Sequence, residues 1–281
     1  MKIAGVQIES TDNFNENFKK CLKYIDISME QDADVVVFPE LSLSSWFPES
    51  INEKNFALAI TIDSEEIRSF REIAKKNSIA LVIPFFEKDS EIDMLFYNSV
   101  VFIDKDGLIK GHYRKIHLPL IPNWEEKYYF RPGDLGFPVF NTSIGKIGFQ
   151  IGWDIFFPEV ARILTLKGAN LIISPTASAF SSQPRWIKVI SANALINTVF
   201  ICRINRVGVQ GELEFYGGSF CVAPDGGLVS EPAGSKEGII LWDINFNDLF
   251  EVRRLFPFLK DRIEKEYLDL IGKSYREILG E

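Results

Sequence analysis

Short apolar runs alternate with amphipathic stretches along this chain, a pattern typical of α/β folds. Residues 14–31 carry apolar side chains at spacings of three and four, which predicts a helix with one buried face. Residues 34–38 are rich in valine and end at Pro39, which predicts a strand buried on both faces. Residues 104–107, Asp-Lys-Asp-Gly, separate two further apolar runs and predict a hairpin.

The remaining elements follow without a linker, a repeat or a shift of composition. Strands are predicted at residues 2–8, 79–86, 96–103, 107–114, 170–174, 199–207, 216–223, 226–230 and 238–243, with a hairpin near 137–151 that turns at 143–145. Helices are predicted at residues 64–77, 158–167 and 184–197, and helical segments broken by Pro257 at 246–279. We therefore expect one α/β domain over residues 1–281, with a helical C-terminal tail at about 246–281.

Composition narrows the classes of function. The net charge is −8 and the basic residues form no block, so nucleic acid is not an expected partner. No run of 18 uninterrupted apolar residues is present, so no membrane span is expected. The N-terminal apolar run is too short for a signal peptide. Cys21, Cys202 and Cys221 are an odd, sparse set, expected to be buried thiols in the cytoplasm and not a disulfide framework.

Two apolar strands end at a charged residue, and ligands collect at strand ends in α/β folds. Glu40 follows the strand at 34–38 and is either a catalytic base or a loop residue. Lys115 either supports a developing oxyanion or is a solvated lysine. His117 has only His112 as another histidine and no cysteine or acid at ligand spacing, so no metal site is expected. His117 is instead predicted to be packed and hydrogen-bonded.

A third strand, 145–151, ends at Gly152, and a helix that opens with Pro158 follows soon after. Such a strand–turn–helix elbow can present a nucleophile, and backbone N–H groups after the turn can form an oxyanion hole. Taken alone, Gly152 is simply a turn glycine, because glycine tolerates a positive φ without steric cost.

Together, several ordered motifs resemble the nitrilase (carbon–nitrogen hydrolase) superfamily over nearly the whole chain. They are Phe-Pro-Glu-Leu at 38–41, Tyr-Arg-Lys-Ile-His-Leu-Pro at 113–119, Glu-Lys-Tyr-Tyr-Phe-Arg-Pro-Gly-Asp-Leu-Gly-Phe at 126–137, Gly-Trp-Asp-Ile-Phe-Phe-Pro-Glu at 152–159, Ser-Pro-Thr-Ala at 174–177 and Asn-Arg-Val-Gly at 205–208. The run at 126–137 is most similar to the branch of N-carbamoylputrescine amidases and N-carbamyl-amino-acid amidases.

The resemblance implies a four-layer αββα sandwich, no cofactor, and a Glu-Lys-Cys triad with a second glutamate. Such a site hydrolyses a non-peptide C–N bond of a small amide or carbamoyl substrate and releases ammonia. In this sequence Glu40 matches the general base, Lys115 the oxyanion-stabilising lysine and Glu126 the auxiliary glutamate. The nucleophile position is occupied by Gly152, and the N–H of Trp153 completes the oxyanion hole.

Further expectations follow from the same motifs. Trp124, Trp153, Thr176 and Ala177 are expected to border the pocket, and the branch suggests a substrate that carries an amine. Two carboxylates around one ammonium predict that one glutamate of the pair has a raised pKa. The helix at 184–197 is apolar on nearly every face, which predicts a homodimer or higher homo-oligomer.

Loss of a nucleophile costs about 10⁶-fold in rate in comparable sites, so the chain is predicted to be inactive or only residually active. A water in the space beside Gly152, activated by Glu40, is a less favoured route. Two explanations for Gly152 stay open. Deliberate replacement in an engineered variant is favoured because the other catalytic positions are retained. The alternative is a natural pseudoenzyme that binds a ligand or forms an assembly.

Overall fold

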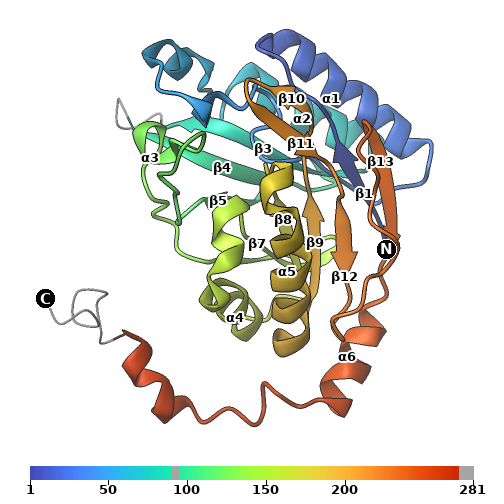
Figure 1. Ribbon diagram of the computed structural model, residues 1–281. Helices are drawn as coiled ribbons and strands as arrows, with labels where there is room; N and C mark the ends of the chain where they lie inside the picture. The colour runs from blue at the N-terminus through green and yellow to red at the C-terminus, as the bar shows by residue number, and fades with distance from the viewer. Residues whose placement is uncertain (90–94, 272–281) are drawn as a thin grey trace, which may run out of the picture.

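The computed structural model describes residues 1–89 and 95–271 of the chain. Two β-sheets lie face to face and helices cover the outer face of each, so the protein is a four-layer αββα sandwich, as the resemblance implied (Figure 1). The first sheet has the order β13–β1–β2–β3–β4–β5. The second has the order β12–β9–β8–β7–β6. A separate two-stranded hairpin is formed by β10 and β11.

The bounds of the elements are close to those predicted from the pattern. The first sheet contains β1 (Lys2–Gln7), β2 (Val35–Val37), β3 (Ala80–Lys88), β4 (Phe96–Ile103), β5 (Ile109–Arg114) and β13 (Gly238–Asp243). The second contains β6 (Val139–Thr142), β7 (Gly145–Phe149), β8 (Leu171–Pro175), β9 (Phe200–Ile204) and β12 (Phe220–Val222). The helices are α1 (Phe14–Met29), α2 (Glu65–Asn77), α3 (Glu126–Tyr129), α4 (Pro158–Leu166), α5 (Gln183–Asn197) and α6 (Phe246–Leu255).

Apolar side chains join the four layers in three cores. Between the sheets, Phe102 of β4 and Phe149 of β7 belong to one buried cluster. Helices α1 and α2 pack on the outer face of the first sheet, and α4 and α5 on that of the second. Strand β2 shows how the sequence achieves this. Val35 and Val37 enter the core between the sheets, while Val36 enters the core beneath α1 and α2, because successive strand residues face opposite sides.

Helix ends follow local chemistry that the sequence already shows. Ser64 caps α2, where its Oγ accepts a hydrogen bond from the backbone N–H of Ile67 at 3.3 Å. Pro158 occupies the first turn of α4, where its missing N–H costs nothing. Helix α6 ends at Leu255, just before Pro257.

Three predicted strands differ from the observed ones, and glycines account for most of the difference. The run at 199–207 ends as β9 at Ile204, and the chain then forms the hairpin of β10 (Val207–Gln210) and β11 (Leu213–Tyr216). Gly217 and Gly218, at φ +64° and +60°, break the run at 216–223. The strand predicted at 226–230 is wrong, because that segment makes a single bridge from Leu228 to Val222 after a turn at Gly226.

The prediction of three thiols is also wrong for two cysteines. Cys202 on β9 lies directly opposite Cys221 on the antiparallel strand β12, and the two form a disulfide. Cross-strand neighbours of this kind have side chains close enough to be joined. Cys21 is a free, fully buried thiol, and burial raises its pKa to about 12. The expectation of a reducing compartment rested on three free thiols, and two of the three cysteines are paired.

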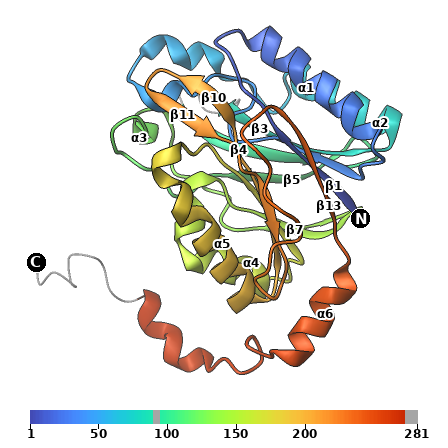
Figure 2. The ribbon, with the colours of Figure 1, turned by 45° about the vertical axis from the view of Figure 1, so that its right-hand side comes forward.

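After α6 the chain leaves the sandwich as an extended arm, seen along the lower edge of Figures 1 and 2. The arm includes the 3₁₀ helix η5 (Glu264–Ile271). Residues 272–281 of the predicted helical tail lie outside the described residues. Within the ranges 1–89 and 95–271, no helix is long and apolar enough to cross a bilayer.

Candidate active site

The predicted site residues meet where strands of both sheets end. Glu40 lies just beyond β2 and Lys115 directly after β5. Strands β2 and β5 run in the same direction, because β3 is parallel to β2 and the two antiparallel steps to β5 restore that direction. Gly152 and Ala177 lie just beyond the parallel strands β7 and β8. All four residues line one pocket of about 460 Å³.

Aromatic side chains form much of the pocket wall. Trp124 and Trp153 line the pocket as expected, together with Phe156 and Trp186. Thr176 does not line the pocket, contrary to the expectation. Its side chain donates a hydrogen bond to the carbonyl of Ile204 at 3.1 Å, because it faces the opposite side of the chain from its neighbour at 177.

The centre of the site is a buried Glu-Lys-Glu cluster. The Nζ of Lys115 donates to Oε1 of Glu40 at 2.8 Å and to both carboxylate oxygens of Glu126, at 2.8 and 2.7 Å. Each of the three side chains is only 1% exposed. Two further donors hold Glu40, the side-chain amide of Asn98 at 2.8 Å and the backbone N–H of Ala177 at 2.9 Å.

Two carboxylates share one ammonium in this cluster, and this arrangement shifts the pKa values of Glu126 and Lys115. Burial raises the pKa of Glu126 to about 7, and the charge of Glu40 adds to this effect while Lys115 opposes it. Burial alone would lower the pKa of Lys115, but the carboxylates of Glu126 and Glu40 outweigh it and raise that pKa above its ordinary value. One glutamate of the pair thus has a raised pKa, as predicted, and Lys115 stays charged.

Gly152 faces this cluster from the second sheet. It adopts a left-handed conformation, with φ at +47°, which glycine accepts without strain. A Cβ at this position would lie 2.6 Å from Oε2 of Glu40 and 2.9 Å from Nζ of Lys115. A side chain at residue 152 would therefore touch both the matched base and the matched lysine. Trp153 follows in the 3₁₀ turn η3 (Gly152–Phe156), and its N–H as an oxyanion donor stays a prediction.

Asp154 fixes the elbow around Gly152, a role that was not inferred from the sequence. Its fully buried carboxylate accepts hydrogen bonds from the N–H of Ile151 at 3.0 Å, the hydroxyl of Tyr113 at 2.7 Å and the N–H of His117 at 3.0 Å. The ring of His117 also bonds to Asp154 at 2.8 Å and stacks on Phe157. His117 is thus packed and hydrogen-bonded, as predicted. The signal for Asp154 was its place two residues after Gly152.

Other residues of the site were also missed, among them Phe156, Asn98, Arg185 and Trp186. Asn98 and the adjacent Ser99 on β4 are polar residues within an otherwise apolar run, which is the signal that could have marked Asn98. Arg185 and Trp186 line the pocket from the first turn of α5, a helix that the sequence suggested only as an oligomer contact. Among residues 1–89 and 95–271, no group of three or more His, Cys, Asp or Glu could hold a metal ion.

Known proteins resemble this chain over nearly its whole length. Residues 2–254 match the family described as Carbon-nitrogen hydrolase. A citrullinase from Francisella tularensis subsp. tularensis is 34% identical over 97% of this chain and 99% of that protein. An N-carbamoylputrescine amidase from Solanum lycopersicum is 32% identical over 97% of this chain and 96% of its own. The crystal structure of a carbon-nitrogen hydrolase from Helicobacter pylori G27 superimposes with a TM-score of 0.93 at 34% identity, covering 98% of this chain and 99% of that one.

Proposed function

The chain belongs to the carbon–nitrogen hydrolase family, and from this we propose that its pocket binds a small amide or carbamoyl compound without appreciable turnover. One observation carries the proposal. Glu40, Lys115 and Glu126 form a complete buried cluster, and the residue that faces it is Gly152. Relatives named citrullinase and N-carbamoylputrescine amidase favour a carbamoyl group as the part of the ligand that enters the cluster.

Each group has a role in the reaction that the family implies. Glu40 would take the proton of an attacking thiol, Lys115 would stabilise the oxyanion, and Glu126 would hold the lysine in place. Without a thiol at residue 152 no covalent acyl intermediate forms, and the reaction cannot be divided into two easier steps. Direct activation of water by Glu40 is a less favoured route, because it forgoes the covalent intermediate that divides the reaction into two easier steps.

Restoring the nucleophile tests this proposal. Gly152→Cys should release ammonia from a carbamoyl substrate that the unchanged chain only binds. Gly152→Ala is the matched control, because it adds the same Cβ and the same backbone strain but no sulfur. If the cysteine variant folds and binds the compound but releases no ammonia, the interpretation of the site as an amidase that lost its nucleophile is wrong. That result would favour a natural binding or assembly protein over an enzyme whose cysteine was replaced.

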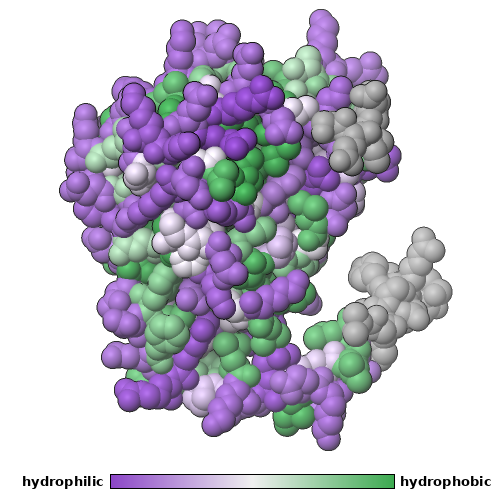
Figure 3. All heavy atoms as spheres, turned by 180° about the vertical axis from the view of Figure 1, so that it is seen from behind, coloured by the Kyte–Doolittle hydropathy of each residue, from purple (hydrophilic) through white to green (hydrophobic). Residues whose placement is uncertain are grey.

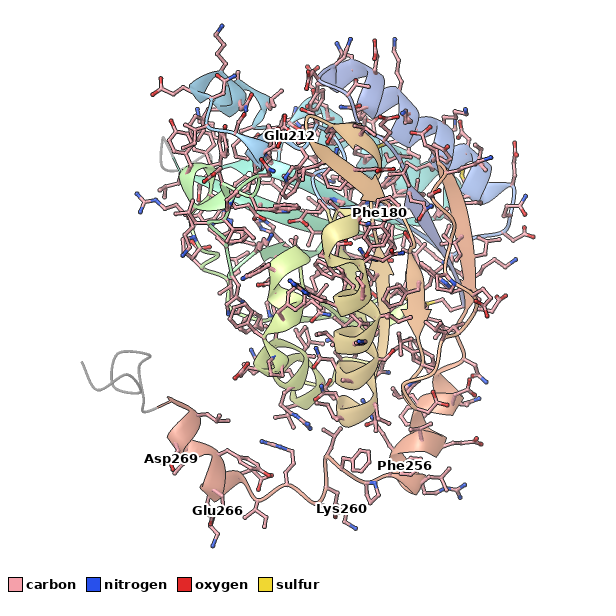
Figure 4. All side chains as sticks on the ribbon, in the orientation of Figure 1. Phe180, Glu212, Phe256, Lys260, Glu266 and Asp269 are labelled. Carbon is pink, nitrogen blue, oxygen red and sulfur yellow. A yellow bond between two sulfur atoms is a disulfide. The ribbon has the colours of Figure 1, made fainter. Side chains whose placement is uncertain are left out.

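We also propose that the chain forms a homo-oligomer through α5 and the C-terminal arm. Ile196 on α5 is 41% exposed, and Leu255 at the end of α6 and Leu268 on the arm are each 67% exposed. Figure 3 shows hydrophobic side chains on the arm, and Figure 4 shows Phe256 and Lys260 on the stretch that leaves the body. In a symmetric homo-oligomer, the exposed apolar residues of α5 and of the arm on one copy can pack against the same residues of a second copy.

Sedimentation of an Ile196→Glu variant tests this assembly. A buried carboxylate is costly at an apolar contact, so the variant should sediment as a smaller species than the unchanged chain. Lys188→Gln, on an exposed face of the same helix, should leave the size unchanged. An unchanged chain that sediments as a monomer would refute the assembly.

A further inference from the structure

We propose that Arg206 is a positioning residue of the site. It holds the strained turn at residues 41–44, and this turn aims the carboxylate of Glu40 at Lys115. The inference rests on the proposed function, since it takes Glu40 as a group that acts on the ligand. Arg206 does not line the pocket, so it acts on the site only through the turn.

The turn directly after Glu40 is strained. Leu41 has a φ of +52°, a left-handed conformation that is unfavourable for a residue with a Cβ. Backbone strain of this kind persists only where the surrounding structure fixes it. The side chain of Leu41 is fully buried in one cluster with Phe47 and Phe86, but the backbone carbonyls of the turn need partners of their own. Without such partners the turn would relax, and Glu40 would move with it.

Buried side chains supply most of these partners. The carbonyl of Leu41 accepts a hydrogen bond from the N–H of Ser44 at 3.1 Å, within the turn. The carbonyls of residues 42, 43 and 44 each accept a hydrogen bond from a buried side chain of another segment. In that order, the donors are the hydroxyl of Ser10 at 3.0 Å, the side-chain amide of Asn17 at 3.2 Å and Nη2 of Arg206 at 2.8 Å. Each donor therefore stabilises the strained conformation.

Arg206 is the strongest of these three donors. A hydrogen bond from a guanidinium is charge-assisted and about twice as strong as one between neutral groups. Ser10 follows β1 and Asn17 lies on α1, on the side of the first sheet, whereas Arg206 follows β9 of the second sheet. Arg206 therefore ties the turn after Glu40 to the sheet whose strand β7 precedes Gly152.

Packing does not explain an arginine at this place. Its side chain is fully buried, and Nε and Nη1 have no hydrogen-bond partner among the described residues. The guanidinium lies 5.6 Å from the ring centre of Phe215. Burial lowers the pKa of Arg206 to about 10, and the charges of Glu40 and Glu9 oppose this effect, so the guanidinium stays charged at neutral pH. An apolar side chain of similar volume would be less costly to bury, but it could not bond to the turn.

The position of Glu40 can be measured through Glu126. Burial raises the pKa of Glu126 to about 7, Lys115 opposes this effect, and the charge of Glu40 adds to it. A turn that relaxes moves Glu40 away from the cluster, so the pKa of Glu126 falls. Removal of the Arg206 charge without any movement has the opposite sign, because the two carboxylates lose a stabilising cation and the pKa rises. The direction of the shift therefore separates a positioning role from a purely electrostatic one.

Two measurements test the role of Arg206. Hydrogen exchange followed by mass spectrometry reports the opening of residues 41–44, and urea unfolding at several pH values reports where the stability from protonated Glu126 is lost. In Arg206→Met the turn should exchange about tenfold faster than in the unchanged protein, the effect of one charge-assisted hydrogen bond. The loss of stability that the unchanged protein shows as pH rises through about 7 should move to lower pH.

Three further variants complete the test. Arg206→Lys keeps the charge and a donor, and should restore both values toward those of the unchanged protein. Ser10→Ala removes a weaker bond from the same turn, and should change both values in the same direction as Arg206→Met but by less. Arg253→Met is the matched control, because Arg253 also donates to backbone carbonyls, those of Thr198 and Ala169, but away from the turn. It should leave both values unchanged.

The outcomes distinguish the positioning role from its alternatives. The inference is overturned if Arg206→Met leaves the exchange of the turn unchanged, or if its loss of stability stays near pH 7 or moves higher. If Arg206→Met does not fold, Ser10→Ala decides by the same two criteria. A flat profile in the unchanged protein also overturns the inference, since Glu40 then does not act on Glu126. Neither measurement uses a ligand, so failure of the proposed function, seen as no calorimetric binding of butylurea or N-carbamoylputrescine, is a separate result.

Discussion

Replacing Glu126 by glutamine should change how the stability of the protein depends on pH. Burial raises the pKa of Glu126 in the folded protein to about 7, against an ordinary value of 4.5. Between these values the folded protein holds a proton that the unfolded chain has lost, so the free energy of unfolding falls as pH rises. The contribution is fully present below pH 4.5 and is lost as pH rises through about 7.

The magnitude follows from the same two values. At about 1.4 kcal/mol for each pH unit, a folded pKa of about 7 makes the contribution about 3 kcal/mol. Glu87 is a second buried glutamate with a shifted pKa, but it titrates at lower pH and does not affect this loss of stability. The first effect on its pKa is burial, which raises it, but His112 and Arg114 outweigh burial and lower the pKa to about 2. Its stabilising contribution is therefore present above 4.5 and is lost only as pH falls through about 2.

Urea unfolding at about pH 5, 6, 7 and 8, followed by tryptophan fluorescence, measures this dependence. The unchanged protein should lose about 3 kcal/mol over this interval, and Glu126→Gln should show a flatter profile. Glu125→Gln, a neighbouring partly buried glutamate outside the Lys115 cluster, should keep the original slope. The reasoning would be refuted by a flat profile in the unchanged protein, or by an unchanged slope in Glu126→Gln.

Three further substitutions, at two positions, probe the elbow at Gly152. Gly152→Ala and Gly152→Cys should each destabilise the protein by about 1–3 kcal/mol, because a side chain at φ +47° is strained and would displace Glu40. A variant as stable in urea as the unchanged protein would show that the turn relaxes. Asp154→Asn should lower the free energy of unfolding by about 2–3 kcal/mol, because it removes a charged acceptor from Tyr113 and His117. It should also weaken ligand binding measured by calorimetry. A variant with full stability and full affinity would contradict the role of Asp154.

Most helices and strands could be predicted from the sequence, because each depends on residues close to it along the chain. The valines of β2 and the Ser64 cap of α2 act on their own neighbourhoods, and such signals survive in the native structure. Pairing between distant segments is different. Nothing in the local sequence states that Cys202 and Cys221 lie opposite each other, because that depends on the register of two strands.

The site residues also divide into those that local patterns predict and those that they do not. Patterns placed Glu40 and Lys115 at strand ends, but only the resemblance marked Glu126, which lies on a helix of four residues too short for a periodic signal. Thr176 and Ala177 are adjacent in sequence, and proximity to a motif could not tell which of them faces the pocket. Arg185 was passed over because the pattern of α5 reports burial, not the cavity beside its first turn.

The hydrogen bond from the N–H of Ala177 to Glu40 joins the end of a strand in one sheet to the end of a strand in the other. The geometry of the pocket therefore depends on how the two sheets are aligned. A small shift of one sheet relative to the other would change the distance between Ala177 and Glu40 before it exposed the core. Conservative substitutions between the sheets, at positions such as Phe102 or Phe149, would then alter ligand affinity without any contact with the ligand. A search for variants with altered specificity has reason to include that buried layer as well as the pocket wall.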